Sequence, residues 1–482
     1  MRKLAVFALS TLLTGCFKVG PDYQKPSVDT PGQWRFADRE ARDLSNSKWW
    51  EQFGDPVLNG LMDQAFRGNL DLKIAAARVE EFMGLYGSTR SNLFPQFSGN
   101  AEYLRRKSSS QVFSFPGAGS PTNSPFDFAR LGVAMDWELD VWGVLRRANE
   151  AALADLQSQE AIRRAVLLTL ASDIAQTYVQ LRTLDNNLEI TRQIVATLAE
   201  QRRIDHARFR EGYGSELEVS QVESEYQRRL ALIPGVEESI AQTEHALKVL
   251  LGENPGSIAR GRNLDELALP PVPAGLPSDL LIRRPDIQQA EQQLISANAR
   301  IGVARGQYFP KIALTGDVGQ LSTQMATLFT PGANFWAIGS TLLTPIFTAG
   351  RIAGQVQAAE AVQREALANY QRSILSAFRE FEDALVAIQK TREQQQRQGA
   401  RVGAVANYYR LSKLRYDEGL VDYITLLDSL RQLYEAQIDL LQSQSSTFTA
   451  SIQLYRAMGG GWIVQAEESA DLPKPDEAAF FP

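Results

Sequence analysis

The feature that most constrains the fold of this chain is a stretch of about 68 residues, 144–211, that contains neither Gly nor Pro. Ala, Leu, Glu, Gln and Arg dominate the stretch, and these residue types favour helix. Gly143 precedes it and Gly212 follows it, so the pattern predicts one uninterrupted helix. At 1.5 Å per residue, such a helix is roughly 100 Å long.

Apolar residues recur at heptad spacing along this stretch and along a second stretch without Gly or Pro, 420–458. The spacing predicts coiled-coil seams, and two adjacent apolar lines on one helix predict neighbours on two sides. In 144–211 the two lines are Leu167, Ile174, Leu181, Leu188 and Val195, and Leu170, Thr177, Leu184, Thr191 and Leu198. In 420–458 they are Leu420, Leu427, Tyr434, Leu441, Phe448 and Tyr455, and Leu426, Leu433, Leu440 and Leu454.

The chain contains two related halves. Residues 208–219 align with residues 415–426 at an offset of 207, and residues 69–97 align with 284–312 at an offset of 215. The first half therefore carries eight additional residues in one loop. Internal repetition of this kind predicts a tandem duplication. Glycines matched at the offset of 207 are Gly143 with Gly350, Gly212 with Gly419, and Gly252 with Gly459. We expect Gly212 and Gly419 to be helix-to-helix turns at one far end.

Each half also carries a segment with a period of two, which predicts a β-hairpin: about 95–139 in the first half and about 310–343 in the second. Leu131, Val133, Met135 and Trp137 alternate with polar or small residues. A half-buried soluble sheet is one interpretation. Strands of about ten residues with aromatics and long loops fit a membrane barrel better. Four strands cannot close a barrel alone, because lipid tolerates no open sheet edge, so several chains must share one.

The only cysteine, Cys16, follows a short basic segment, an apolar run of about ten residues and Leu13-Thr14-Gly15. This order is typical of a secretory signal, and the apolar run is too short to span a bilayer. The segment resembles the bacterial lipobox, in which the Cys is acylated after cleavage. An ordinary signal peptide with an incidental Cys is the alternative. Phe17 is not the Asp that marks retention at the inner membrane, so the resemblance implies the outer membrane.

The composition argues against several functional classes. The net charge is −6 with interspersed signs, which gives no basic surface for nucleic acid. His206 and His245 are the only histidines, and both lie in charged helical surroundings. The sequence shows no Gly-rich phosphate loop, metal-ligand spacing or catalytic triad. We therefore expect no enzyme activity, no catalytic residues, no cofactor and no metal.

These features together resemble the TolC-like outer-membrane efflux proteins, in particular the lipoprotein branch typified by OprM. The segment 47–72, SKWWEQFGDPVLNGLMDQAFRGNLDL, carries that branch's WW..F.DP.L..L...A...N.DL pattern. YFPKIALTG and the Gly pair at 459–460 match as well. The long first hairpin loop is a departure that affects surface exposure. The resemblance covers nearly the whole chain.

The resemblance implies a homotrimer with a shared 12-stranded β-barrel and a 12-helix α-barrel, each chain contributing two β-hairpins and very long coiled-coil helices. It also implies a periplasmic adaptor and an inner-membrane pump, of RND type, as partners. The expected function is an outer-membrane exit duct for small molecules such as drugs, closed at its periplasmic tip until engaged. Adaptor-binding tips are expected at Gly212, Tyr213, Gly419 and Leu420.

A gate is expected near the second turn. Ile424, Asp428, Arg431 and Glu435 share one helix face by their spacing, and a solvated face with a local Asp–Arg pair is the alternative. In the resembling branch the matching YLTLLDAQR segment carries the aperture, and here the segment is YITLLDSLR, 423–431. The resemblance favours a gate formed by Ile424, Asp428 and Arg431. Three copies of Asp428 around an axis would favour cations.

The expected organisation is a signal peptide, two repeats, a linker and flanking segments. Residues 17–60, the linker and the tail are polar and interrupted by Pro and Gly, and we expect them to form a belt around the middle of the helices. The bounds are 1–15 for the signal peptide, 16–60 for the N-terminal segment, 61–252 for the first repeat with helices at about 144–251, 253–277 for the linker, 278–460 for the second repeat with helices at about 351–458, and 461–482 for the tail.

Two other functions fit part of the sequence. A lipid-anchored coiled-coil scaffold that bridges the envelope layers would explain the lipobox and the heptads, but it leaves the paired hairpins unexplained. An ungated porin would explain the strands and leave the long helices without a role. The identity of the exported substrate does not follow from the sequence, because a duct conducts what its pump delivers.

Overall fold

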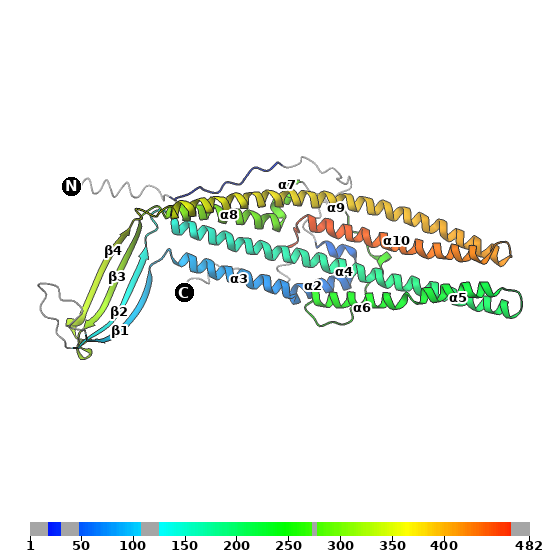
Figure 1. Ribbon diagram of the computed structural model, residues 1–482, viewed down its shortest axis with the longest axis horizontal. Coiled ribbons are helices and arrows are strands. Elements are labelled where there is room, and N and C mark those ends of the chain that lie inside the picture. Colours follow the sequence, from blue (N-terminus) through cyan, green and yellow to red (C-terminus); the bar gives the residue numbers. More distant parts are fainter. Residues whose placement is uncertain (1–17, 30–47, 108–124, 272–276, 464–482) are drawn as a thin grey trace.

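The computed structural model describes residues 18–29, 48–107, 125–271 and 277–463. The chain is strongly elongated (Figure 1). A small β-sheet lies at one end, and the turns around Gly212 and Gly419 lie at the other. Long helices connect the two ends.

Two helices of 67 residues each run the length of the helical part: α4, Val144–Arg210, and α9, Arg351–Asp417. Each begins after a glycine in the left-handed conformation, Gly143 at φ 76° and Gly350 at φ 83°. This conformation carries no steric penalty for glycine and lets the chain turn sharply out of the sheet. The uninterrupted helix predicted from 144–211 is confirmed.

The chain returns from the far end through α5, Glu216–Leu230, and α6, Ile233–Leu250, in the first half, and through α10, Tyr423–Ala457, in the second. The first return is interrupted because Pro234 occupies the start of α6, where its missing N–H costs nothing. In α10 the main heptad line is buried at Leu427, Tyr434, Leu441, Phe448 and Tyr455. Leu420, the expected first member of that line, is 65% exposed, because it lies in the turn before the helix begins.

Shorter helices accompany these long ones. Helix α8 packs against both α4 and α9, and α3 packs against α4. Their bounds are η1 Trp49–Phe53, α2 Pro56–Gly68, α3 Leu70–Ser91, η2 Leu264–Glu266, α7 Pro277–Arg283 and α8 Pro285–Gly306. None of the described helices combines the length and the apolar character needed to cross a membrane.

The sheet has four antiparallel strands in sequential order. They are β1 Gln96–Arg106, β2 Phe126–Glu138, β3 Lys311–Ser322 and β4 Asn334–Leu343, with η3 Met325–Thr327 and η4 Pro331–Ala333 between the last two. The two predicted hairpins are therefore confirmed as structural elements. Within the described residues, the outer edges of β1 and β4 have no strand partner.

The strand register separates two faces of the sheet. Val133 pairs with Gly99 and Val318 on one face, and Ala134 pairs with Ser98 and Asp317 on the other. The first face continues through exposed apolar side chains, which include Phe97, Tyr103, Leu131, Trp336 and Ile338. The second carries an ion pair between Arg130 and Asp317. The alternation predicted for β2 thus extends across the whole sheet.

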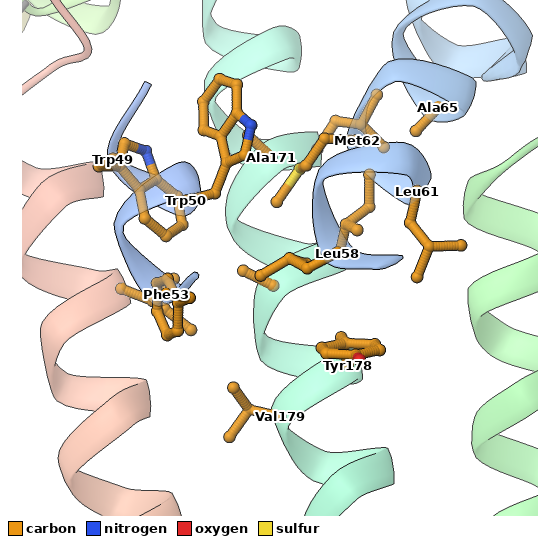
Figure 2. Close-up of a cluster of buried hydrophobic side chains, with 14 of the residues drawn as sticks. Trp49, Trp50, Phe53, Leu58, Leu61, Met62, Ala65, Ala171, Tyr178 and Val179 are labelled. Atoms are coloured by element: carbon orange, nitrogen blue, oxygen red, sulfur yellow. The ribbon is translucent and has the colours of Figure 1, made fainter. Parts of the chain in front are cut away.

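A large hydrophobic core lies midway along the helices, where segments from outside the repeats pack on α4 and α10 (Figure 2). The segment 48–60 contributes Trp49, Trp50 and Phe53, and the start of the tail contributes Trp462. Trp50 packs edge-on against Trp462, with ring centroids 4.7 Å apart. These segments therefore lie at the middle of the helices, as expected.

The described start of the expected belt lies elsewhere. Residues 18–22 lie beside the junction between the sheet and the helices, where the Val19 N–H donates to the Trp142 carbonyl at 3.0 Å. Figure 1 shows residues 18–29 running from there alongside the helices toward α7. The prediction that all of 17–60 lies at the middle was wrong for this segment, because backbone pairing next to the sheet fixes its start.

A buried carboxylate organises the hydrophobic core. Asp55 caps the start of α2 by accepting from the Val57 N–H at 2.8 Å, and it also accepts from the Tyr178 hydroxyl at 2.6 Å and the Arg262 N–H at 3.0 Å. Its side chain is fully buried. Gly261 is required beside it, because a Cβ there would overlap the carboxylate. One side chain thus joins α2, α4 and the linker.

Replacement of this carboxylate provides a test of the core. Asp55→Ala removes a helix cap and leaves the Tyr178 hydroxyl and two backbone N–H groups without their acceptor, so we expect a loss of about 3 kcal/mol in stability. The measurement is the melting temperature of the purified protein. Asp71→Ala, which removes an exposed acid from the first turn of α3, is the control. Equal melting temperatures for the two variants would contradict the role of Asp55.

Candidate functional site: the helical tips

Both helix-to-helix turns are built in the same way. The Tyr213 N–H donates to the Arg208 carbonyl and the Leu420 N–H to the Arg415 carbonyl, each at 2.8 Å. Each bond spans a glycine at positive φ, Gly212 at 78° and Gly419 at 72°, which is the Schellman ending of a helix. The prediction that these glycines are the turns is confirmed.

The two turns present apolar side chains to solvent. Tyr213 is 87% exposed and Leu420 is 65% exposed, and a Cβ at either glycine would meet no atom within 4 Å. Apolar surface at the end of a coiled coil contributes nothing to the stability of this chain. Both side chains are therefore accessible to another protein.

Three residues of the predicted gate lie at the start of α10. Ile424 is 49% exposed and Asp428 is exposed, so both face away from the protein core. The Asp428 carboxylate accepts from the Gln432 side chain at 2.7 Å. Arg431 points in another direction and binds Glu225 of α5. The local pair between Asp428 and Arg431 that the spacing allowed is therefore absent from the structure.

A buried charge cluster that the sequence analysis missed lies behind this face. Glu225 is only 2% exposed, and its Oε2 accepts from Arg431 Nε at 2.8 Å, with Arg431 Nη2 in an ion pair 2.8 Å from the same oxygen. Its Oε1 accepts from Arg229 at 2.8 Å and from Arg228 at 3.0 Å. The Arg229 guanidinium also lies over the Tyr434 ring, 4.1 Å from its centroid. Burial by itself would raise the pKa of Glu225, but hydrogen bonds from Arg431 and Arg229 outweigh it and lower the pKa.

A second buried acid lies in the hydrophobic core of the tips. Asp205 of α4 is 3% exposed and accepts from Gln201 at 2.8 Å through one oxygen. Its other oxygen, Oδ2, has no hydrogen-bond partner. Burial raises the pKa of Asp205 to about 6, against the opposing effects of Gln201 and the Arg208 charge. Tyr416 and Tyr423 belong to the same core, with ring centroids 5.6 Å apart.

The sequence held a signal for both acids. Asp205 lies seven residues after Leu198 and so continues an apolar heptad line of α4. On α5, Glu225 and Arg229 follow the buried Val222 at spacings of three and seven. A charged residue at a heptad core position must bind a partner or change its protonation state. Its presence on an apolar line therefore predicts a buried ion pair or a shifted pKa.

The sequence analysis also predicted that the protein binds no metal and that Cys16 carries lipid. Among the described residues, no group of three or more His, Cys, Asp or Glu side chains could hold a metal. Cys16 lies outside the described residues. The segment that follows it is held at the junction of sheet and helices, where the buried Arg147 donates to the Val19 and Gly20 carbonyls and to the Asp22 carboxylate.

Comparison with known proteins identifies the family. Residues 61–253 and 276–460 match the sequence profile of the outer membrane efflux proteins. The solvent efflux pump outer membrane protein SrpC of Pseudomonas putida is 36% identical over 473 residues, which span 96% of this chain and 99% of that protein. This chain belongs to the outer membrane efflux protein family. It is therefore an outer-membrane protein that serves as the exit duct of an efflux system.

Two further comparisons describe this outer membrane efflux protein. The probable outer membrane lipoprotein SilC of Salmonella typhimurium is 30% identical over 473 residues, which span 96% of this chain and all of that protein. The solved structure of the Campylobacter jejuni CmeC outer membrane channel superposes with a TM-score of 0.87 at 26% identity, covering 96% of this chain and 99% of that one. The elongated fold is thus that of an outer-membrane channel.

The acid in the tip core should make stability depend on pH. The pKa of Asp205 is about 6 in the folded protein against 3.8 when free, so folding favours the protonated acid. That contribution is fully present below about pH 4 and is lost as the pH rises through about 6. Asp205→Asn, which is neutral throughout, should therefore be more stable than the parent at neutral pH, by on the order of 3 kcal/mol at most.

The measurement is the melting temperature of parent and variant at about pH 4 and about pH 7.5. The advantage of the Asn variant should grow with pH, and Asp417→Asn, at the exposed end of α9, should show no such trend. A difference of equal size at both pH values would contradict a buried acid with a raised pKa.

Proposed function

We propose that three copies of this chain form one continuous gated duct, with a shared 12-stranded β-barrel in the outer membrane and a 12-helix α-barrel in the periplasm. The observation that carries the proposal is the four-stranded sheet with two unpaired edges and an exposed apolar face. Open edges cannot face lipid, so the sheet requires partner strands. Three copies supply twelve strands, which is within the size range of bacterial barrels, and the resemblance to TolC-like proteins favours three copies.

The periplasmic end of the duct would be closed by the helical tips. In this proposal Ile424 and Asp428, which are exposed at the start of α10, face the axis of the trimer. Arg431 completes the gate by joining α10 to α5 through Glu225. An apolar constriction next to a ring of three carboxylates would restrict flow and favour cations.

The two ends of the molecule would contact different partners, the tips contacting periplasmic proteins and the sheet contacting the membrane. We propose that a periplasmic adaptor binds the tips at Gly212, Tyr213, Gly419 and Leu420, and that an inner-membrane pump of RND type delivers small molecules such as drugs. Cys16 would carry lipid, because residues 18–22 are held beside the sheet, at the level expected for the membrane surface. The name of SilC, an outer membrane lipoprotein, supports this anchor.

Other functions predict different electrical behaviour. A lipid-anchored scaffold would show no conductance in planar bilayers, and an ungated porin would show large, steady pores. The proposed duct should show small, infrequent openings. The sheet at the end opposite the tips favours the duct over the scaffold, because a scaffold has no use for strands with one apolar face.

Mutation of the aperture tests the gate. Asp428→Ala removes three negative charges from the axis, so we expect weaker cation preference and more frequent openings, and Ile424→Ala should increase opening further by trimming the constriction. Asp428 is exposed and accepts its hydrogen bond from the neutral Gln432 side chain at the surface, so assembly should be unaffected. Single-channel recording at matched salt is the measurement, with Glu435→Ala as the control. Parental conductance and selectivity in the double variant would place the aperture elsewhere.

Mutation of a turn tests adaptor binding. Gly419→Trp places a bulky side chain on the exposed turn, so efflux should be lost while the protein still reaches the outer membrane. Gly419→Ala tests for strain at the positive φ of 72°, and Gly399→Trp places the same bulk on an open site within α9, away from the turn. Drug accumulation and adaptor crosslinking are the measurements. Normal crosslinking and efflux in Gly419→Trp would argue against docking at this turn.

A further inference from the structure

Two opposite charges on α10, one helical turn apart, are directed to different surroundings. Asp428 is exposed, and among the described residues its hydrogen-bond partner is the neutral Gln432 side chain. Arg431, three residues later, donates its Nε–H to Glu225 of α5, and its Nη2 lies 2.8 Å from the same carboxylate oxygen. The spacing of Asp428 and Arg431 would allow them to pair on the helix surface. Glu225 prevents this pairing by binding the guanidinium.

The geometry of the cluster explains why Glu225 prevails. Its carboxylate is 2% exposed and accepts from three arginines, so it offers Arg431 a charge-assisted bond away from water. Asp428 lies in solvent, where an ion pair contributes little. The Arg431 side chain is 35% exposed, which leaves it a path back to the surface.

We propose that Glu225 is a positioning residue that sets the charge of the aperture by holding Arg431 against α5 and leaving Asp428 without a cationic partner. The inference rests on the proposed gate at Asp428. It adds that a buried residue on another helix decides the ion selectivity of that gate. Glu225 itself need not touch a permeating ion.

Loss of the Glu225 charge should release Arg431 and not its neighbours. Arg229 is 6% exposed and stacked on Tyr434, and Arg228 is already half in solvent. Without the carboxylate, three guanidinium groups repel one another, and the Arg431 side chain turns away from α5 to the exposed surface of its own helix, α10. Asp428 lies three residues before it, whereas Glu435 lies four residues after it, in the less favourable order of charges on a helix.

The test is the reversal potential of single channels under a KCl gradient. Glu225→Gln should lower the ratio of cation to anion permeability by roughly two- to fivefold, because Arg431 now neutralises Asp428. Glu225→Gln combined with Arg431→Gln should restore the parental ratio, since no guanidinium remains to pair with Asp428. Glu237→Gln, which removes an exposed ion pair between α6 and α4, is the matched control and should leave the ratio unchanged.

The outcomes separate the two proposals. Parental selectivity in Glu225→Gln, or an equal loss in the single and double variants, would overturn the role of Glu225. Asp428→Asn in the parent tests the gate itself, and if it leaves selectivity unchanged the gate assignment fails whatever the Glu225 variants show. If Glu225→Gln does not assemble, Arg431→Gln alone is the test. An increase in cation selectivity would place the Arg431 charge in the parental aperture and overturn the proposal. Unchanged cation selectivity would support it.

Discussion

The structure depends on two helices, α4 and α9, that each run 67 residues without a break from the sheet to the tips. A single helix of roughly 100 Å has no stability of its own in water, because most helical stability comes from packing of an apolar face. The other helices supply this packing, each over a different part of α4 and α9. The return helices cover the far half, α3 and α8 cover the half near the sheet, and η1, α2, Trp462 and Ile463 cover the middle.

The chain distributes its buried charges unevenly along these helices. In the middle, Asp55 has three well-formed donors and lies among large aromatic residues, which favours a rigid core. At the tips, Asp205 has an oxygen without a partner, and Glu225 collects three arginines. Charged residues at coiled-coil core positions reduce stability in exchange for a defined register. Because burial raises the pKa of Asp205, the packing of the tips depends on pH.

Much of the architecture follows from local pattern. Freedom from Gly and Pro predicted the limits of α4 to within one residue at its end, and alternation placed the four strands. Gly212 and Gly419 were identified as turns because a helix that ends in a Schellman motif needs a residue that tolerates positive φ. These features succeed because they depend on residues close together in the chain. Two expectations failed for different reasons. Leu420 is exposed because it lies in the local turn before α10, and residues 18–22 lie at the sheet junction because Val19 pairs with Trp142, far along the chain.

The sequence by itself determined the elements, their order and the family. Periodicity, turn residues and the motif in residues 47–72 depend only on residues close together in the chain. It also placed Ile424 and Asp428 on one exposed helix face. The direction taken by Arg431 was decided only by the tertiary structure. Helical spacing offered it Asp428 and Glu435, and the partner that it binds, Glu225, lies 206 residues away on another helix. A buried carboxylate attracts a guanidinium more strongly than an exposed one, and burial is a property of the packed helices and not of either segment alone.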